Sequence, residues 1–305
     1  MRQRWLLNLA LLVAVLILAT VVYTLENKEP IKAPKLTNLA TAQIQNIQIE
    51  RADAEPISFA KDGLGRWQIT APLQLPAASF QVERLLEILG KDDYQKLETT
   101  GPDLTAFKLE PPLAKVKFDK LTVAFGDSSP MNDGKRYVLI KQNIYLLTDT
   151  LYYTLTGDAL TFASLIPLGN NAKITELKMP DYHLISQDGK WELTTTFSSE
   201  EIESSQDAIN ALINNWQNAS AYKVERHDSE ASSGQGQIEI TLLGQEQPLH
   251  FEIVGKTSDL VLARPEKGVQ YQLAVNQVGK LLHLPTKSDA STDITAPPPE
   301  VTTAP

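Results

Sequence analysis

Apolar and polar residues alternate along short stretches of the chain, in an order that occurs twice. In the first half, residues 44–49 and then residues 57–59 alternate between apolar and polar side chains. Alternation with a period of two is typical of strands that bury one face. A turn with two glycines at residues 62–65 then leads into a strand around Trp67. The pattern therefore predicts an antiparallel β-meander.

A helical pattern follows this meander. Four apolar residues spaced i, i+3, i+4 and i+7 predict one face of a helix that ends at Gly90, with Ser79 as a candidate N-cap. The four are Val82, Leu85, Leu86 and Leu89. More strands and a short helical segment are then expected. The strands cover residues 116–118, 121–125, 137–140 and 144–147, and the helical segment lies near residues 158–165.

The same order returns in the second half of the chain. Trp191 follows a turn at residues 188–189, displaced from Trp67 by 191 − 67 = 124 positions, and Ser205 is a candidate N-cap for the helix that comes next. That helix repeats the earlier spacing, with an offset of 127. Its apolar residues are Ile209, Leu212, Ile213 and Trp216. The remaining elements are strands at 238–243, 249–254, 260–263 and 269–273 and a short helical segment near 275–283.

These patterns predict an α+β fold. It consists of two tandem copies of an antiparallel β-meander/helix/β-meander unit, one over residues 42–168 and one over residues 169–285, behind one N-terminal transmembrane helix. The alternative is a single larger α+β domain with coincidental internal similarity. The nearly constant offset through four helix positions favours a duplication.

Six residues define the structural motif that the two copies share. They are Trp67, Leu85 and Leu86 in the first copy and Trp191, Leu212 and Ile213 in the second. Each tryptophan is expected to pack on the helix of its own copy, because an indole ring is among the largest apolar groups a small core can bury. The alternative is that the two rings are stacking platforms for a sugar or a peptide.

The N-terminus carries a long apolar run. Residues 6–25 contain no charged side chain, and about 20 such residues are needed for a helix that crosses a bilayer. Arg2 and Arg4 precede the run, so residues 1–5 are expected to be cytoplasmic and the rest of the chain to lie outside. The alternative is a cleaved signal peptide, but its best cleavage site, after Ala19, has Ile17 where a small residue is needed.

Polar segments flank the folded part. Residues 26–41 contain Pro30 and Pro34 and are predicted to form a stalk, and residues 286–305, rich in Ser, Thr, Ala and Pro, are predicted to form a disordered tail. The expected location is the inner membrane, with residues 6–25 in the lipid bilayer and the folded part in the periplasm.

Composition narrows the function classes. The formal net charge of the 305 residues is −9, which argues against nucleic acid as a partner because such proteins need a basic face. The chain has no cysteine, which excludes disulfides, thiol catalysis and cysteine-ligated metals.

No set of residues has the spacing of a catalytic, cofactor or metal site. The four histidines are scattered, and they are His183, His227, His250 and His283. The sequence at 255–257 resembles the end of a phosphate-binding loop but is expected to form a hairpin turn. Ser58 and Lys61 have the Ser-x-x-Lys spacing, but on a strand they point to opposite faces. Glu200, Glu201, Glu203 and Asp207 are interpreted as a solvated face at a helix N-terminus.

The stretch from Gly65 through Ala71-Pro72 and on to the helix that ends at Leu89 resembles a bacterial family known as domain of unknown function 4340. The second copy keeps Trp191 but lacks the proline, so the resemblance is closer over the first copy. It implies a membrane-anchored extracytoplasmic protein, and some members accompany components of ABC-type transport systems. It implies no catalytic residue.

Two functions remain open. The preferred hypothesis is a non-enzymatic accessory or scaffold protein that contacts a membrane complex or another envelope protein through a sheet edge or the cleft between the copies. The alternative is a periplasmic module that binds an unidentified small molecule in that cleft. An enzyme is a distant third, since no catalytic motif is present.

Overall fold

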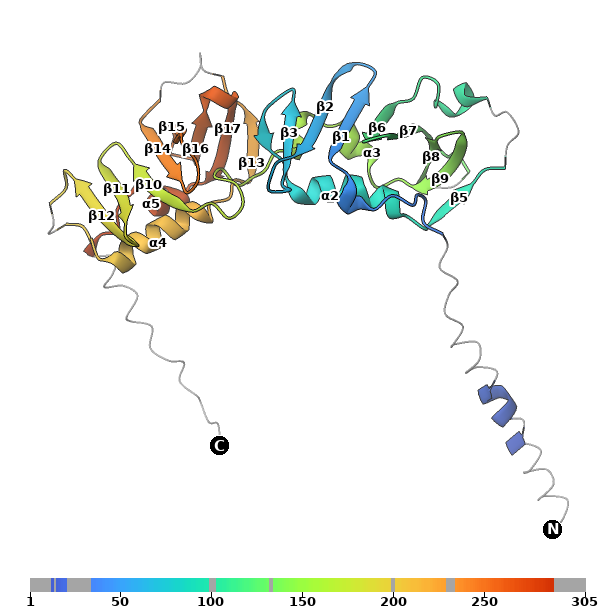
Figure 1. Cartoon of the computed structure of the whole chain (residues 1–305), viewed down its shortest axis with the longest axis horizontal. Coiled ribbons are helices and arrows are strands. Elements are labelled where there is room, and N and C mark those ends of the chain that lie inside the picture. Colours follow the sequence, from blue (N-terminus) through green and yellow to red (C-terminus); the bar gives the residue numbers. More distant parts are fainter. Residues whose placement is uncertain are drawn as a thin grey trace, which may run out of the picture.

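The computed structural model describes residues 12–13, 15–20, 34–98, 103–131, 134–198, 201–228 and 234–287. These residues form two antiparallel β-sheets, of nine and eight strands, with a few short helices. The α+β class predicted from the sequence is therefore confirmed. Figure 1 shows the sheets side by side along an elongated molecule, with helices α2 and α4 on the same side.

The first sheet has the strand order β4-β3-β2-β1-β6-β7-β8-β9-β5. Its strands are β1 (Asn46–Arg51), β2 (Ala54–Lys61), β3 (Trp67–Ala71), β4 (Leu75–Pro76), β5 (Tyr94–Lys96), β6 (Ala114–Phe118), β7 (Leu121–Ser128), β8 (Lys135–Ile140) and β9 (Asn143–Thr148). Period-two patterning predicted all of them except β4 and β5. Those two strands have only two and three residues, too few to show alternation.

The second sheet has the order β12-β11-β10-β14-β15-β16-β17-β13. Its strands are β10 (Ile174–Lys178), β11 (Tyr182–Gln187), β12 (Lys190–Thr195), β13 (Lys223–Arg226), β14 (Gln237–Leu242), β15 (Leu249–Gly255), β16 (Asp259–Arg264) and β17 (Val269–Ala274). If β4 is left out and the strands of each sheet are numbered anew in chain order, the two sheets have the same strand order. Strand β4 has no counterpart in the second sheet. Hereafter, the first unit is the first sheet with its helices, and the second unit is the second sheet with its helices.

A long helix follows the third strand of each meander. These helices are α2 (Ser79–Glu87), continued by the 3-10 turn Ile88–Gly90, and α4 (Gln206–Gln217). The shorter helices are α3 (Tyr152–Thr156) and α5 (Gln277–Leu282). Further 3-10 turns lie at Thr41–Gln43, Leu104–Phe107, Ala159–Phe162 and Pro265–Lys267. The helical segment expected near 158–165 is the 3-10 turn Ala159–Phe162, and α3 precedes it.

One of the two predicted N-caps is correct. The Ser205 hydroxyl accepts a hydrogen bond from the Ala208 N–H at 3.3 Å, as an N-cap should. Ser79 is instead the first residue inside α2, and the prediction that it caps this helix was wrong. The N-cap is Ala78, whose N–H donates to the Phe162 carbonyl at 2.7 Å, so a contact from elsewhere in the chain fixes the helix start.

The buried core lies between each sheet and its helices. In the first unit the core includes Phe59 and Phe162, whose rings meet edge to face at 5.2 Å. In the second unit Trp216 on α4 is fully buried, and its indole N–H donates to the Leu281 carbonyl of α5 at 2.8 Å. This bond ties the two helices of the second unit together.

Backbone hydrogen bonds connect the two units. The segment 162–165, hereafter the linker, bridges to Ala77 at Ala163, and the Ser164 N–H donates to the Pro76 carbonyl at 2.8 Å. On its other side the linker accepts a bond from the Ala221 N–H at the Leu165 carbonyl, also at 2.8 Å. The linker is therefore held between the β4 end of the first sheet and the β13 end of the second.

The predicted stalk is in part packed on the fold. Leu36 is 9% exposed, and its N–H donates to the Lys91 carbonyl at 2.7 Å, while the Thr37 N–H donates to the Leu89 carbonyl at 3.1 Å. These contacts show that residues 34–41 belong to the first unit. Burial of the apolar Leu36 side chain favours this packing. Residues 26–33 lie outside the described residues, as does the predicted tail from residue 288 onward.

Among the residues that the structure describes, none of the helices has both the length and the apolar character to cross a bilayer. Most of the predicted transmembrane segment, residues 6–25, lies outside those residues. Residues 15–20 are helical, and the Thr20 hydroxyl donates to the Leu16 carbonyl at 2.7 Å.

Candidate interaction surface

The described side chains form no recognisable reactive cluster. No three His, Asp or Glu residues in the described part of the chain are placed to hold a metal ion. His183 lies 2.7 Å from the Glu176 carboxylate and His227 lies 3.1 Å from Gln270, so both have ordinary strand neighbours. The Lys61 amine donates to the Ala42 carbonyl at 3.0 Å. Gly255 ends β15, and residues 256–257 lie in the turn between β15 and β16.

Five of the six motif residues predicted from the sequence are buried. Trp67 is 8% exposed, and the Lys61 amine lies 5.1 Å above its ring. Trp191, the sixth, is only half-buried on β12, the outermost strand of its sheet. The other buried members are Leu85, Leu86, Leu212 and Ile213. The two tryptophans, which match in the sequence, therefore differ in their surroundings.

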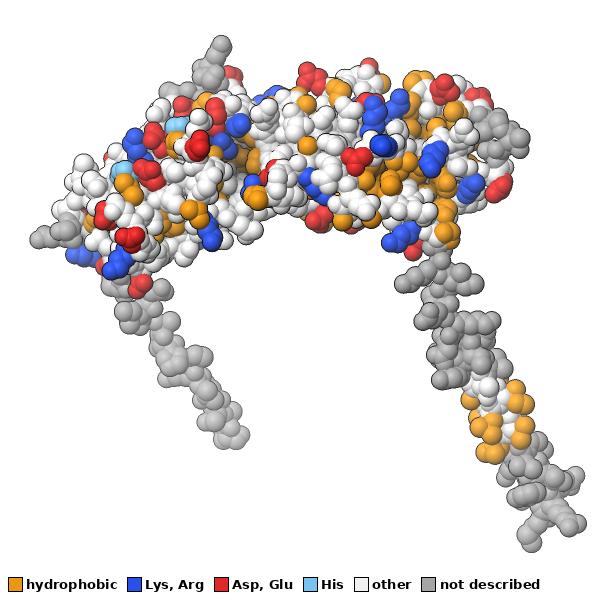
Figure 2. Space-filling model, in the orientation of Figure 1, with side chains coloured by type: hydrophobic (Ala, Val, Ile, Leu, Met, Phe, Trp, Pro, Cys, Tyr) orange, Lys and Arg blue, Asp and Glu red, His pale blue; other side chains and the backbone are white. Residues whose placement is uncertain are grey.

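A groove of about 1080 Å³ lies where residues 34–46 meet the turns β6–β7 and β8–β9. We name it the head groove. Its apolar lining includes Leu39, which is 41% exposed, together with Phe118, Leu121 and Tyr145. In Figure 2, apolar side chains gather at the end of the first unit from which the N-terminal segment leaves, and lysine or arginine side chains border them. This surface is apolar at its centre and charged at its rim.

The rim of the head groove is mainly basic. Lys35, Lys120 and Lys141 line it, all three are exposed, and none pairs with another described residue within salt-bridge distance. Asp119 is the acidic group there. Burial alone would raise the pKa of the Asp119 carboxyl, but hydrogen bonds from Gln45 and Asn46 outweigh it and hold that pKa below its ordinary value. Asp119 therefore remains ionised and fixes residues 45–46 against the β6–β7 turn.

A second groove, of about 640 Å³, lies at the junction of the two units, where the sequence-based alternative expected a ligand. From the first unit it is lined by the β2–β3 turn, by Trp67 and by the start of α2, and from the second by Asn170, Asn171 and Gln245. The Asp62 carboxylate bonds the Arg66 guanidinium at 2.8 Å on its wall. The lining of this groove is therefore largely polar.

The far end of the molecule carries an open sheet edge. Among the described residues, strand β12 pairs only with β11, and no described strand lies on its other side. The Gln206 side chain covers one position of this edge. It accepts from the Trp191 N–H at 2.9 Å and donates to the Trp191 carbonyl at 2.8 Å. We name residues 187–195 with the start of α4 the tail edge.

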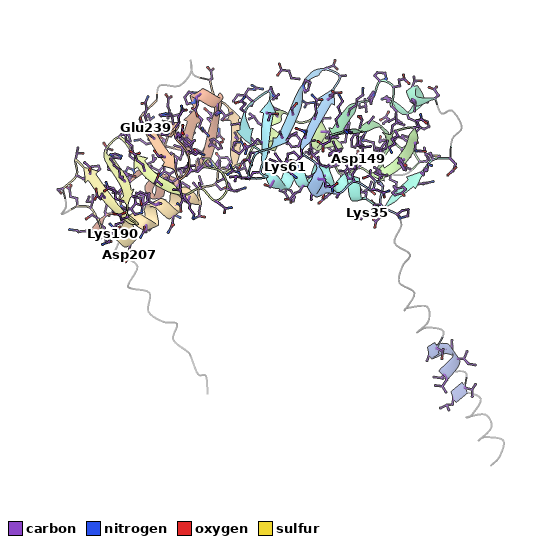
Figure 3. The ribbon with its side chains drawn as sticks, viewed as in Figure 1. Lys35, Lys61, Asp149, Lys190, Asp207 and Glu239 are labelled. Carbon is purple, nitrogen blue, oxygen red and sulfur yellow. The ribbon has the colours of Figure 1, made fainter. Side chains whose placement is uncertain are left out.

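Acidic side chains surround the tail edge. Glu192, Glu201 and Asp207 are exposed there. Figure 3 shows Lys190 and Asp207 at one end of the molecule and Lys35 at the other. The two ends of the molecule therefore differ in charge, one basic around the head groove and one mainly acidic around the tail edge.

Sequence reasoning did not find the head groove. Its lining comes from a segment interpreted as a stalk and from two turns far apart in the chain, and no spacing rule connects them. One signal was available, because Leu36 and Leu39 are, with Ile31, the large apolar residues of the segment 26–41.

Comparison with known proteins gives one match. The family model described as Domain of unknown function (DUF4340) covers residues 67–237, from Trp67 at the start of β3 to Gln237 at the start of β14. No curated protein and no solved structure matches the chain. The family model spans more than half of the 305 residues, including the motif residues of both units, and the chain belongs to the DUF4340 family.

Proposed function

We propose that the protein is a non-enzymatic, membrane-anchored scaffold or accessory subunit of a bacterial envelope complex, with ABC-type transport systems as the first class to examine. Residues 6–25 anchor it in the inner membrane, with the N-terminus in the cytoplasm. The periplasmic part consists of two tandem copies of one α+β unit. The matching strand order of the two sheets and the 124-residue displacement of the tryptophan motif support the duplication.

The position of the head groove carries this proposal. Only residues 26–33 separate it from the predicted anchor, and eight extended residues span at most about 29 Å. A partner in this groove is therefore itself in the membrane or close to it. An apolar centre with a charged rim is the usual composition of a protein-binding surface.

Affinity purification from detergent-solubilised membranes tests the proposal. Full-length protein is expected to retain a specific envelope protein, and Leu39→Glu is expected to lower the recovery of that protein about tenfold or more, because it puts a charge at the apolar centre of the groove. Tyr153→Glu is the matched control, since Tyr153 is 91% exposed and does not line the groove.

Two results would count against a scaffold. One is that no protein is retained specifically. The other is that Leu39→Glu and Tyr153→Glu retain the same proteins in the same amounts, which would place any partner elsewhere on the molecule.

A further inference from the structure

We propose that copies of this chain associate end to end, with the tail edge of one copy in the head groove of the next. The occupant of the groove is a second copy of the same chain, except in the terminal copy of a string, whose groove stays open to the envelope partner proposed above. The contact between the two units within one chain shows how such an interface is built.

Within one chain, the first unit covers the linker, the segment that precedes the second sheet. Pro76, at the end of the edge strand β4, and Ala77 after it pair with the linker, and the β2–β3 turn and Trp67 line the groove beside it. The linker also pairs with the second unit through Leu165 and Ala221. The β4 end of the first sheet, beside Trp67, thus packs on the linker that precedes the second sheet.

The head groove is the matching surface of the first unit. Residues 34–39 precede β1 as the linker precedes β10, and they pair with residues 89–91 as the linker pairs with Ala221. Each groove is lined by the segment that precedes the first strand of its sheet, residues 34–39 in one and the linker in the other. Each is also lined by a turn of that sheet, β6–β7 in one and β14–β15 in the other. In the first unit, however, no described strand or linker pairs with the outer side of residues 34–39. The linker before the second sheet is covered by the first unit, whereas the corresponding residues 34–39 before the first sheet are open on their outer side.

The tail edge is the matching surface of the second unit. Strand β12 corresponds to β3 and Trp191 to Trp67, but the short strand β4 that completes the first sheet has no counterpart beyond β12. Trp67 is 8% exposed, with β4 beside its strand, whereas Trp191, with no such strand beside it, is only half-buried. Outside the single position bonded by Gln206, the edge is free to pair.

Charge favours the same pairing. Lys35, Lys120 and Lys141 outnumber Asp119 at the rim of the head groove, and Glu192 and Asp207 outnumber Lys190 at the tail edge. Opposite potentials steer two surfaces together and disfavour head-to-head or tail-to-tail contacts, in which like charges meet. Because the two surfaces differ, the contact is heterologous, so it leaves a free surface at each end and repeats into a string of copies.

Cross-linking of full-length protein in membranes tests this arrangement. The natural chain has no cysteine, so introduced cysteines react without background. A variant with both Leu39→Cys and Glu192→Cys, treated with a short bis-maleimide, is expected to give a ladder of dimers, trimers and larger species. Two differently tagged single variants, mixed in one membrane, are expected to give dimers that carry both tags and no larger species.

The controls separate a specific contact from crowding. Tyr153→Cys with Glu192→Cys places one thiol outside the groove, at a position more exposed than Leu39 (91% against 41%), and is expected to give no ladder. Lys120→Glu with Lys141→Glu, added to the reactive pair, is expected to weaken the ladder, and added salt should do the same.

Several outcomes would overturn end-to-end association. They are the absence of a ladder from a variant whose thermal unfolding matches that of the natural chain, an equal ladder from the Tyr153→Cys control, or dimers from Leu39→Cys alone. End-to-end association does not require a foreign partner, so a ladder without any retained envelope protein would contradict only the scaffold proposal.

Discussion

Replacing Trp216 with alanine is expected to lower the free energy of unfolding by about 3–5 kcal/mol. The Trp216 side chain is fully buried, its ring centroid lies 6.2 Å from that of Phe251, and its N–H bonds the Leu281 carbonyl at 2.8 Å. Alanine leaves a large cavity and removes the only side-chain hydrogen bond described between Trp216 and α5. Urea unfolding followed by circular dichroism measures the loss.

The matched control is Trp191→Ala, the same substitution at a half-buried position on an edge strand. The Trp191 side chain buries less apolar surface on folding than that of Trp216. We therefore expect Trp191→Ala to lower the free energy of unfolding by about 2 kcal/mol or less. Equal losses for the two variants would mean that the second unit is not held together by a core centred on α4.

Replacing Arg136 with methionine is expected to destabilise the protein by about 3 kcal/mol. Arg136 is 8% exposed, and its guanidinium bonds the Asp149 carboxylate at 2.7 Å and the Gly126 carbonyl at 2.6 Å. It also lies 3.7 Å from the centre of the Tyr152 ring. Methionine fills part of the volume but leaves the Asp149 carboxylate, whose side chain is only 17% exposed, without its cation.

Arg66→Met is the control for this prediction. Its partner Asp62 is also an aspartate at 2.8 Å, but the Arg66 side chain is 54% exposed, so a loss below about 1 kcal/mol is expected. Adding Asp149→Asn to Arg136→Met should restore part of the stability, because the unpaired charge is then absent. A loss from Arg136→Met no larger than that from Arg66→Met would show that the buried ion pair contributes little.

The sequence carried enough information for the main elements of the fold. The two-residue alternation identified the long strands, and the i, i+3, i+4, i+7 spacing identified α2 and α4, because their buried faces demand it. Strands β4 and β5 were missed because they are too short to show alternation, and β13 was missed because its partner β17 is distant in the chain. Ser79 was misplaced by one position for the same reason, because the Phe162 carbonyl fixes the start of α2.

The candidate surfaces were less predictable than the fold. An open edge follows from the absence of a partner for β12, and only the strand order reveals that β4 has no counterpart. The head groove depends on how residues 34–46 lie against two turns, which no local pattern encodes. Local sequence reports which face of an element is buried, whereas a binding surface is assembled by tertiary contacts.

The central functional claim, an anchored scaffold that faces away from the cytoplasm, is tested most directly by fusing alkaline phosphatase after residue 285 and fractionating the cells. We expect active phosphatase in the membrane fraction that resists a high-salt wash, as an uncleaved anchor over residues 6–25 requires. Inactive phosphatase would place the folded units in the cytoplasm. Active phosphatase in the soluble fraction would show that the N-terminal segment is removed. Either result would contradict the claim.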